Sequence, residues 1–170
     1  MARAAMIGLV LVVAALLEVS VLPVMAVSGF TPDLLLLLVI AFALQDGALT
    51  AVKVALPAGL LTDLLSSNAP LGMSVLVYVG IGYGVGAARP YLSPESVTAP
   101  ILFVAAGTFL GVGGYGVLSA LLAQESATLR LISEASLVAT VYALLLAPAA
   151  LAVVRYVDRQ FPLDLSAAAQ

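Results

Sequence analysis

The stretch "GLLTDLLSSNAPLG" (residues 59–72) decides how this chain folds. It places Asp63 between leucine pairs and ends in a polar turn before the next apolar run. A carboxylate at membrane depth is costly, and such groups usually face the inside of a helix bundle or a water-filled cavity. We therefore expect two helices joined by the turn, with Asp63 turned toward the protein.

The composition indicates an integral membrane protein. Of 170 residues, 64% are hydrophobic and 9% are charged, and the mean hydropathy is +1.22. This is more apolar surface than a soluble domain of this length could bury. The absence of cysteine and histidine excludes disulfides, thiolate nucleophiles, imidazole chemistry and most zinc sites. We expect no cofactor and no metal, and the scattered cations form no basic patch for nucleic acid.

Six apolar segments are candidates for membrane-spanning helices, which need about 20 residues each. They are residues 4–27, 32–44, 49–65, 71–88, 97–123 and 134–157. The second is short and reaches the interfaces only with its flanks or in a locally thinned bilayer. The first is longer than the apolar part of a signal peptide, so we expect it to be retained. The sequence predicts an all-α integral membrane protein, a six-helix transmembrane bundle over residues 1–157 with a short cytoplasmic tail, 158–170.

The cations predict the orientation of the bundle. If the amino terminus is cytoplasmic, Arg130 falls outside, and the positive-inside rule is obeyed by the remaining cations. Those on or near the inner side are Arg3, Lys53, Arg89, Arg155 and Arg159. We therefore expect both termini in the cytoplasm.

This orientation brings three acids to the outer half of the bundle. Asp33 starts one helix, Asp63 lies near the end of the next, and Glu18 lies late in the first segment. Our hypothesis is that these carboxylates line a polar, outward-facing depression, with Arg130 as the available cation.

Structural interpretations of the three acids remain open. Asp33 follows Thr31 and Pro32 and could stabilise a helix start. Asp63 could bond to neighbouring hydroxyl groups at the interface, since the dipole disfavours an acid at a helix carboxyl end. Glu18 could face a neighbouring helix as a protonated acid.

Glycines recur at four-residue spacing in two segments. This spacing lets helix backbones approach closely, either within the bundle or against a partner helix. The pairs are Gly80 and Gly84, Gly82 and Gly86, and Gly107 and Gly111.

Residues 31–89 resemble the family of the bacterial rod shape-determining membrane protein MreD. The resemblance rests on Pro32-Asp33 opening a leucine-rich helix, then "GLLTDLL" (residues 59–65), then the turn Pro70-Leu71-Gly72. The chain departs from the family at Asp46-Gly47, where many relatives carry basic residues, and in the polar connection around Arg130.

The resemblance implies a non-enzymatic scaffold in the bacterial cytoplasmic (inner) membrane, spanning it several times. It would bind MreC and act with MreB and the RodA/penicillin-binding-protein synthase in lateral peptidoglycan synthesis, surrounded by membrane lipid. The family fold is similar to the substrate-binding subunits of energy-coupling-factor vitamin transporters. The candidate partner-binding or pocket residues are Glu18, Asp33, Asp63, Pro70, Leu71, Gly72 and Arg130.

Two other classes of function compete with the scaffold. A substrate-binding membrane subunit of a vitamin transporter would need an enclosed pocket with convergent polar groups. A membrane enzyme could use two acids on adjacent helices as a general acid–base pair. The sequence lacks the clustered acids expected for metal–phosphate chemistry, so we expect no enzymatic activity.

Overall fold

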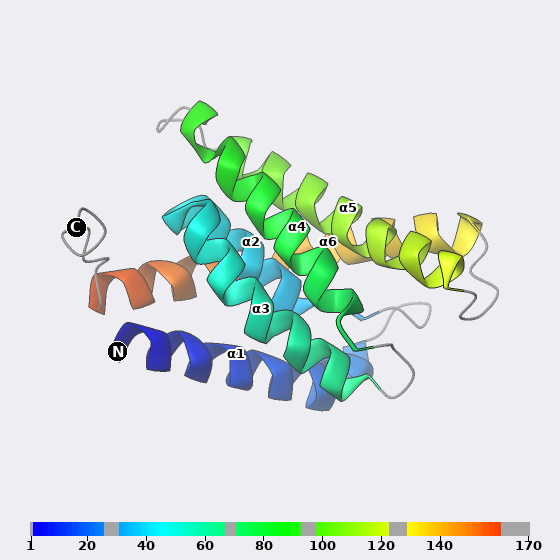
Figure 1. Cartoon of the computed structure of the whole chain (residues 1–170), viewed down its shortest axis with the longest axis horizontal. Helices are drawn as coiled ribbons and strands as arrows, with labels where there is room; N and C mark the ends of the chain where they lie inside the picture. The colour runs from blue at the N-terminus through cyan, green and yellow to red at the C-terminus, as the bar shows by residue number, and fades with distance from the viewer. Residues whose placement is uncertain (1, 26–30, 67–70, 93–97, 123–128, 161–170) are drawn as a thin grey trace.

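The computed structural model describes residues 2–25, 31–66, 71–92, 98–122 and 129–160. In these ranges the chain is helical (Figure 1), and each of the six predicted segments contains one α-helix. The helices are α1 (Ala2–Ser20), η1 (Leu22–Met25), α2 (Leu34–Asp46), α3 (Ala48–Leu65), α4 (Met73–Ala88), η2 (Arg89–Tyr91), α5 (Thr98–Leu121) and α6 (Leu129–Gln160). The last helix is longer than predicted at both ends, and it takes in the first residues of the expected tail.

Four of the helices in the described ranges are long and apolar enough to cross a membrane: α1 with η1, α3, α5 and α6. The remaining two, α2 and α4, have 13 and 16 residues. At a rise of 1.5 Å per residue, α2 is about 20 Å long, short of the hydrocarbon core of about 30 Å. Of the six predicted spans, four therefore have the length and composition of a membrane-spanning helix, whereas α2 and α4 fall short of that length.

The short helix α2 lies at the centre of the bundle. Every residue from Leu35 to Ala43 is buried, and α2 contacts all five other α-helices. Its sequence explains this position, because a helix that is apolar on every side is stable only when it is surrounded by other apolar elements. The predicted second span is thus a core helix, covered by its neighbours.

The closest packing in the bundle joins α3 and α4, which run side by side in Figure 1. A Cβ atom at Gly59 would lie 2.5 Å from the backbone of Val75, and one at Gly86 would overlap the backbone of Ala48. These two glycines therefore let the two backbones touch. Gly72, at φ 98°, adopts a left-handed conformation that suits glycine in the turn before α4.

The other glycine pairs divide between the interior and the surface. Gly82, Gly107 and Gly111 face Val39, Ile40 and Leu36 respectively, all on α2. In contrast, Cβ atoms at Gly80 and Gly84 would meet nothing within 4 Å. Spacing alone predicted a packing role for all of them, and the structure assigns it to the inward-facing ones.

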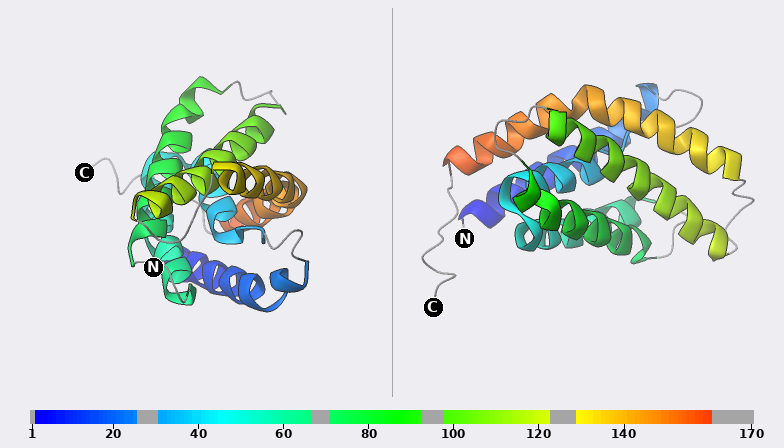
Figure 2. Two further views of the ribbon diagram at one scale, coloured as in Figure 1. Left: turned by 90° about the vertical axis from the view of Figure 1, so that its right-hand side faces the viewer. Right: turned by 90° about the horizontal axis from the view of Figure 1, so that it is seen from above.

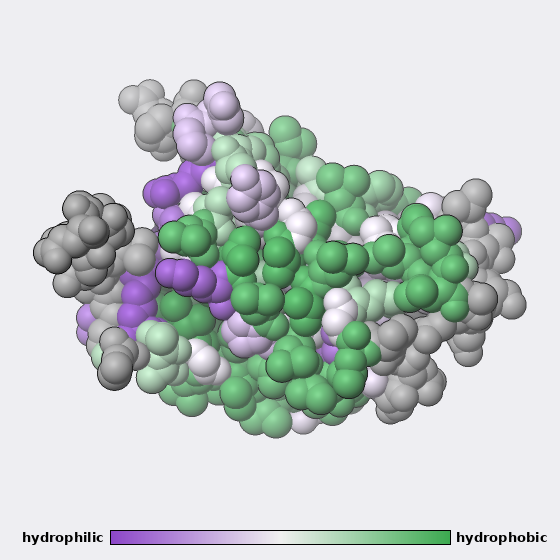
Figure 3. Space-filling model, viewed as in Figure 1, coloured by the Kyte–Doolittle hydropathy of each residue, from purple (hydrophilic) through white to green (hydrophobic). Residues whose placement is uncertain are grey.

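The helices α5 and α6 form a second antiparallel pair (Figure 2). Leucines on their outer faces, such as Leu102 and Leu145, are 66% and 70% exposed. The face of the bundle shown in Figure 3 is mainly hydrophobic, and hydrophilic residues gather toward the end where α1 begins. This distribution fits a protein whose sides contact lipid.

Candidate functional site

A polar cluster surrounds the amino-terminal end of α2. Asp33 caps this helix, because its Oδ1 atom accepts a hydrogen bond of 2.8 Å from the backbone N–H of Leu36. The Oε2 atom of Glu18 lies 3.4 Å from the backbone nitrogen of Leu35, which donates to it. Both carboxylates thus face the positive end of one helix dipole, where negative charge is stabilised. The capping interpretation of Asp33 is confirmed.

Tyr78 connects this cluster to the α3–α4 pair. Its hydroxyl donates a hydrogen bond of 2.6 Å to Oδ2 of Asp33. The hydroxyl of Thr62 lies 3.1 Å from the same tyrosine oxygen. Residues from α2, α3 and α4 therefore share one hydrogen-bonded network, and it fixes the position of the Asp33 carboxylate.

The cluster borders a depression of about 240 Å³. Carboxylate and hydroxyl groups from five segments converge on it, and none of the described residues that line it is a lysine or arginine. Its lining consists of Glu18, Thr31, Pro32, Asp33, Thr62, Ser66, Ser74, Tyr78, Gly111, Val112 and Tyr115. The depression therefore offers the hydrogen-bond acceptors of an acidic pair, and it suits a cationic or hydrogen-bond-donating group.

Asp63 lies beside this depression and has a different task. It is 2% exposed, and its two oxygens accept hydrogen bonds of 2.7 Å and 3.0 Å from the backbone N–H groups of Gly72 and Ser74. Although Asp63 belongs to the last turn of α3, its carboxylate caps the beginning of α4. The sequence suggested bonds from neighbouring hydroxyl groups to Asp63. The structure instead places its carboxylate at the positive end of the following helix, where backbone N–H groups bind it.

The remaining described candidates lie around this end of the bundle. Leu71 is exposed and Gly72 supplies an N–H to Asp63, whereas Pro70 lies outside the described residues. The side chain of Arg130 is 84% exposed and pairs with Glu134 at 2.8 Å, one turn along α6. Arg130 does not line the depression, so the structure separates this cation from the acids that it was expected to balance.

A second polar cluster lies at the other end of α2. The guanidinium of Arg3 bonds to Asp46 at the end of α2 and, at 2.9 Å, to Asp158 near the end of α6. The side chain of Asp46 is 3% exposed, and the guanidinium of Arg3 balances its charge. Because α2 is shorter than the hydrocarbon core, at least one of its ends falls at membrane depth, where unpaired polar groups are costly. The polar clusters at the two ends of α2 supply hydrogen-bond and ion-pair partners for these polar groups.

Sequence reasoning missed Tyr78, Thr62 and the Arg3–Asp46 pair as site residues. A signal for the first two was present, since Thr62 and Ser66, and likewise Ser74 and Tyr78, are four residues apart. This spacing places each polar pair on one helix face. In the described part of the chain, no three acidic, cysteine or histidine side chains are grouped so that they could hold a metal ion.

Comparison with known protein families identifies a match over most of the chain. The sequence model of the family described as rod shape-determining protein MreD matches residues 2–157. No curated protein and no solved structure matched the chain, so the similarity to energy-coupling-factor subunits remains a prediction. Family membership implies a membrane protein with a part in rod shape determination, in association with the shape-determining complex. Because the match covers nearly the whole chain, this protein belongs to the MreD family of rod shape-determining proteins.

Proposed function

We propose that this chain is a non-enzymatic scaffold of the bacterial cell-elongation complex, and that it binds MreC through the outer half of the bundle. The observation that carries the proposal is the polar depression at the start of α2. Two carboxylates are held there in fixed positions, Glu18 on α1 and Asp33 before α2. No cation from the described lining balances them, so a donor from a partner would complete the site.

The proposed location is the bacterial cytoplasmic membrane, with both termini inside. The end of the bundle that holds Arg3 also holds Arg89, whose Nη1 atom would lie 3.7 Å from a Cβ at Gly47. A concentration of arginines at this end supports its assignment to the cytoplasmic side. Reporter fusions at both termini test the assignment, and a periplasmic signal from either fusion would refute it.

The binding proposal is tested by co-purification of MreC with tagged variants from native membranes. Asp33→Asn and Glu18→Gln remove charge but keep size, and asparagine caps helices as well as aspartate does. We expect both variants to fold and to recover less MreC, together with less RodA and MreB. Glu134→Gln is the matched control, because it makes the same change at an exposed acid outside the depression. Unchanged MreC recovery with both acid variants would refute the role of the depression.

One observation favours a second candidate, a substrate-binding membrane subunit of a vitamin transporter. Polar groups from several helices converge on the depression, as such a subunit would need. Its volume of about 240 Å³ is below the range of about 300–1,000 Å³ that is usual for small-molecule sites. Mass spectrometry of small molecules retained by the purified protein distinguishes the two, since a stoichiometric vitamin would favour the transporter subunit.

A further inference from the structure

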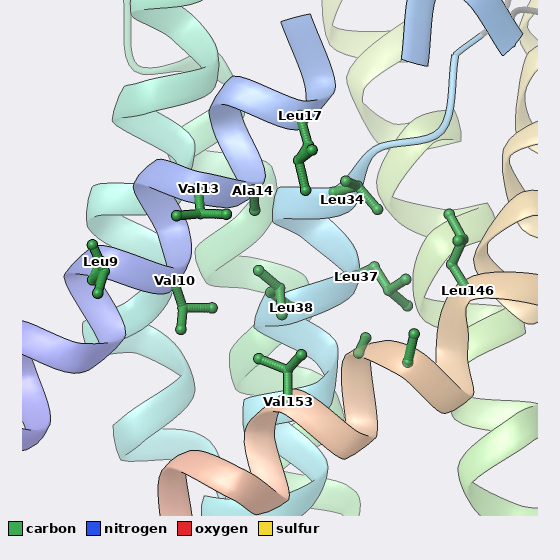
Figure 4. A pocket seen from close by; sticks show the side chains of 12 residues that line it. Leu9, Val10, Val13, Ala14, Leu17, Leu34, Leu37, Leu38, Leu146 and Val153 are labelled. Carbon is green, nitrogen blue, oxygen red and sulfur yellow. The ribbon is translucent and has the colours of Figure 1, made fainter. Parts of the chain in front are cut away.

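An apolar groove of about 460 Å³ runs along the side of the bundle between α1 and α6 (Figure 4). Its floor is α2, through the buried residues Leu37 and Leu38. Its rim is exposed: Leu9 by 58%, Val13 by 48% and Val153 by 39%. Every described residue that lines the groove is leucine, valine or alanine, so only a hydrocarbon surface can fill it.

The shape of the groove suits a helix. On α1 it extends from Leu9 to Leu17, which is about 12 Å, or just over two helical turns. Three of its lining residues, Ala14, Ala149 and Ala150, are small. Small side chains let a second helix approach closely, which is how helices associate where lipid provides no hydrophobic driving force.

Charge at one end of the groove selects the occupant. Leu17 and Leu34 line the groove there, and their neighbours in the chain, Glu18 and Asp33, line the acidic depression. A phospholipid that filled the groove would bring its phosphate toward this acidic pair, and the negative charge that the pair carries repels a phosphate. A helix that ends in lysine or arginine at this level would meet the carboxylates favourably.

We propose that this groove seats the transmembrane helix of a single-span partner. That helix has aliphatic side chains at three- and four-residue spacing toward the groove, and a lysine or arginine just beyond its outer end. The inference rests on the proposed function and adds to it the face of the bundle on which the partner lies and the chemistry that selects it.

Photocrosslinking tests the location, and the cysteine-free chain permits single labels. Val13→Cys and Val153→Cys place a benzophenone maleimide on the groove. Leu76→Cys and Leu110→Cys, 64% and 61% exposed on α4 and α5, are the matched controls. In native membranes that contain epitope-tagged MreC, we expect strong MreC adducts from both groove positions and weak ones from the controls. Equal adducts from all positions, or groove adducts with phospholipid or a second copy alone, would overturn the proposal.

A filled groove provides a second test. Ala149 lines the groove and is exposed, so Ala149→Phe occupies the space without entering the core. Ala106→Phe makes the same change on the exposed face of α5. We expect about tenfold less MreC to co-purify with Ala149→Phe, as for loss of a central contact, and normal recovery with Ala106→Phe.

The outcomes separate the two proposals. If wild-type protein recovers no MreC from native membranes, the proposed function fails. If MreC is recovered but crosslinks only from α4 or α5, and Ala149→Phe binds it normally, the groove is the wrong face and the proposed function stands.

Discussion

Replacing Asp63 by alanine should destabilise the α3–α4 pair more than the same change at either of the other two acids of this cluster, Glu18 and Asp33. The substitution removes both acceptors for the N–H groups of Gly72 and Ser74, which are bonded at 2.7 Å and 3.0 Å. Asp63 is 2% exposed, so water cannot readily replace the lost oxygens. The amino-terminal end of α4 would then lose both acceptors, and the N–H of Ser74, which is 1% exposed, would be left unpaired.

The magnitude follows from the two hydrogen bonds. A bond to a charged group contributes about 1.5–3 kcal/mol, and loss of a helix cap costs about 0.5–2 kcal/mol. These terms overlap, because the same N–H groups are counted in both. We therefore expect Asp63→Ala to lower the free energy of unfolding by about 2–4 kcal/mol. Asp63→Asn keeps one acceptor oxygen and should cost about half as much.

The assay is reversible unfolding of the purified protein in mixed micelles, followed by the loss of helical circular dichroism. Glu134→Ala is the control, since it removes an acid from an exposed ion pair and should change stability by less than about 1 kcal/mol. The reasoning is refuted if Asp63→Ala unfolds within about 0.5 kcal/mol of the wild type, or if asparagine is as harmful as alanine.

Two further predictions concern the far end of α2 and the α3–α4 contact. Arg3→Ala removes the ion-pair partner of the Asp46 carboxylate and should lower the free energy of unfolding by about 3–5 kcal/mol. Adding Asp46→Asn should recover part of this loss. If the two substitutions lower the free energy additively in the same unfolding assay, the two side chains are not coupled. Gly59→Ala places a Cβ 2.5 Å from the backbone of Val75 and should cost at least about 1–3 kcal/mol through overpacking. Gly84→Ala, where a Cβ meets nothing, should be neutral within about 0.5 kcal/mol, and equal effects at the two glycines would contradict the close approach.

Local patterns in the sequence predicted much of the fold. Apolar runs separated by helix breakers located the six α-helices that the described residues form, because hydrophobicity and turn chemistry are properties of short segments. The capping role of Asp33 could also be predicted from the sequence. The N–H group that donates to its carboxylate belongs to Leu36, only three residues away. The same evidence indicated a membrane protein and the resemblance to the MreD family, which the match over residues 2–157 confirms.

The candidate site was predicted less well, because its contacts join distant parts of the chain. Leu35 lies 17 residues from Glu18, and Tyr78 lies 45 residues from Asp33. No pattern within one segment could identify these pairs. Arg130 illustrates the limit, since the predicted topology places it with the acids whereas its side chain pairs with Glu134 on the same helix.

The sequence by itself determined the membrane class, the number of helices and the family, since these depend on composition and on spacing along the chain. Only the tertiary structure decided that α2 lies at the centre, which glycines touch a neighbouring helix, and that Asp63 caps α4. The physical reason is that a short apolar helix in a membrane must bury all its sides and find hydrogen-bond partners for the polar groups at both its ends. Which groups meet that demand depends on how the other helices assemble around it.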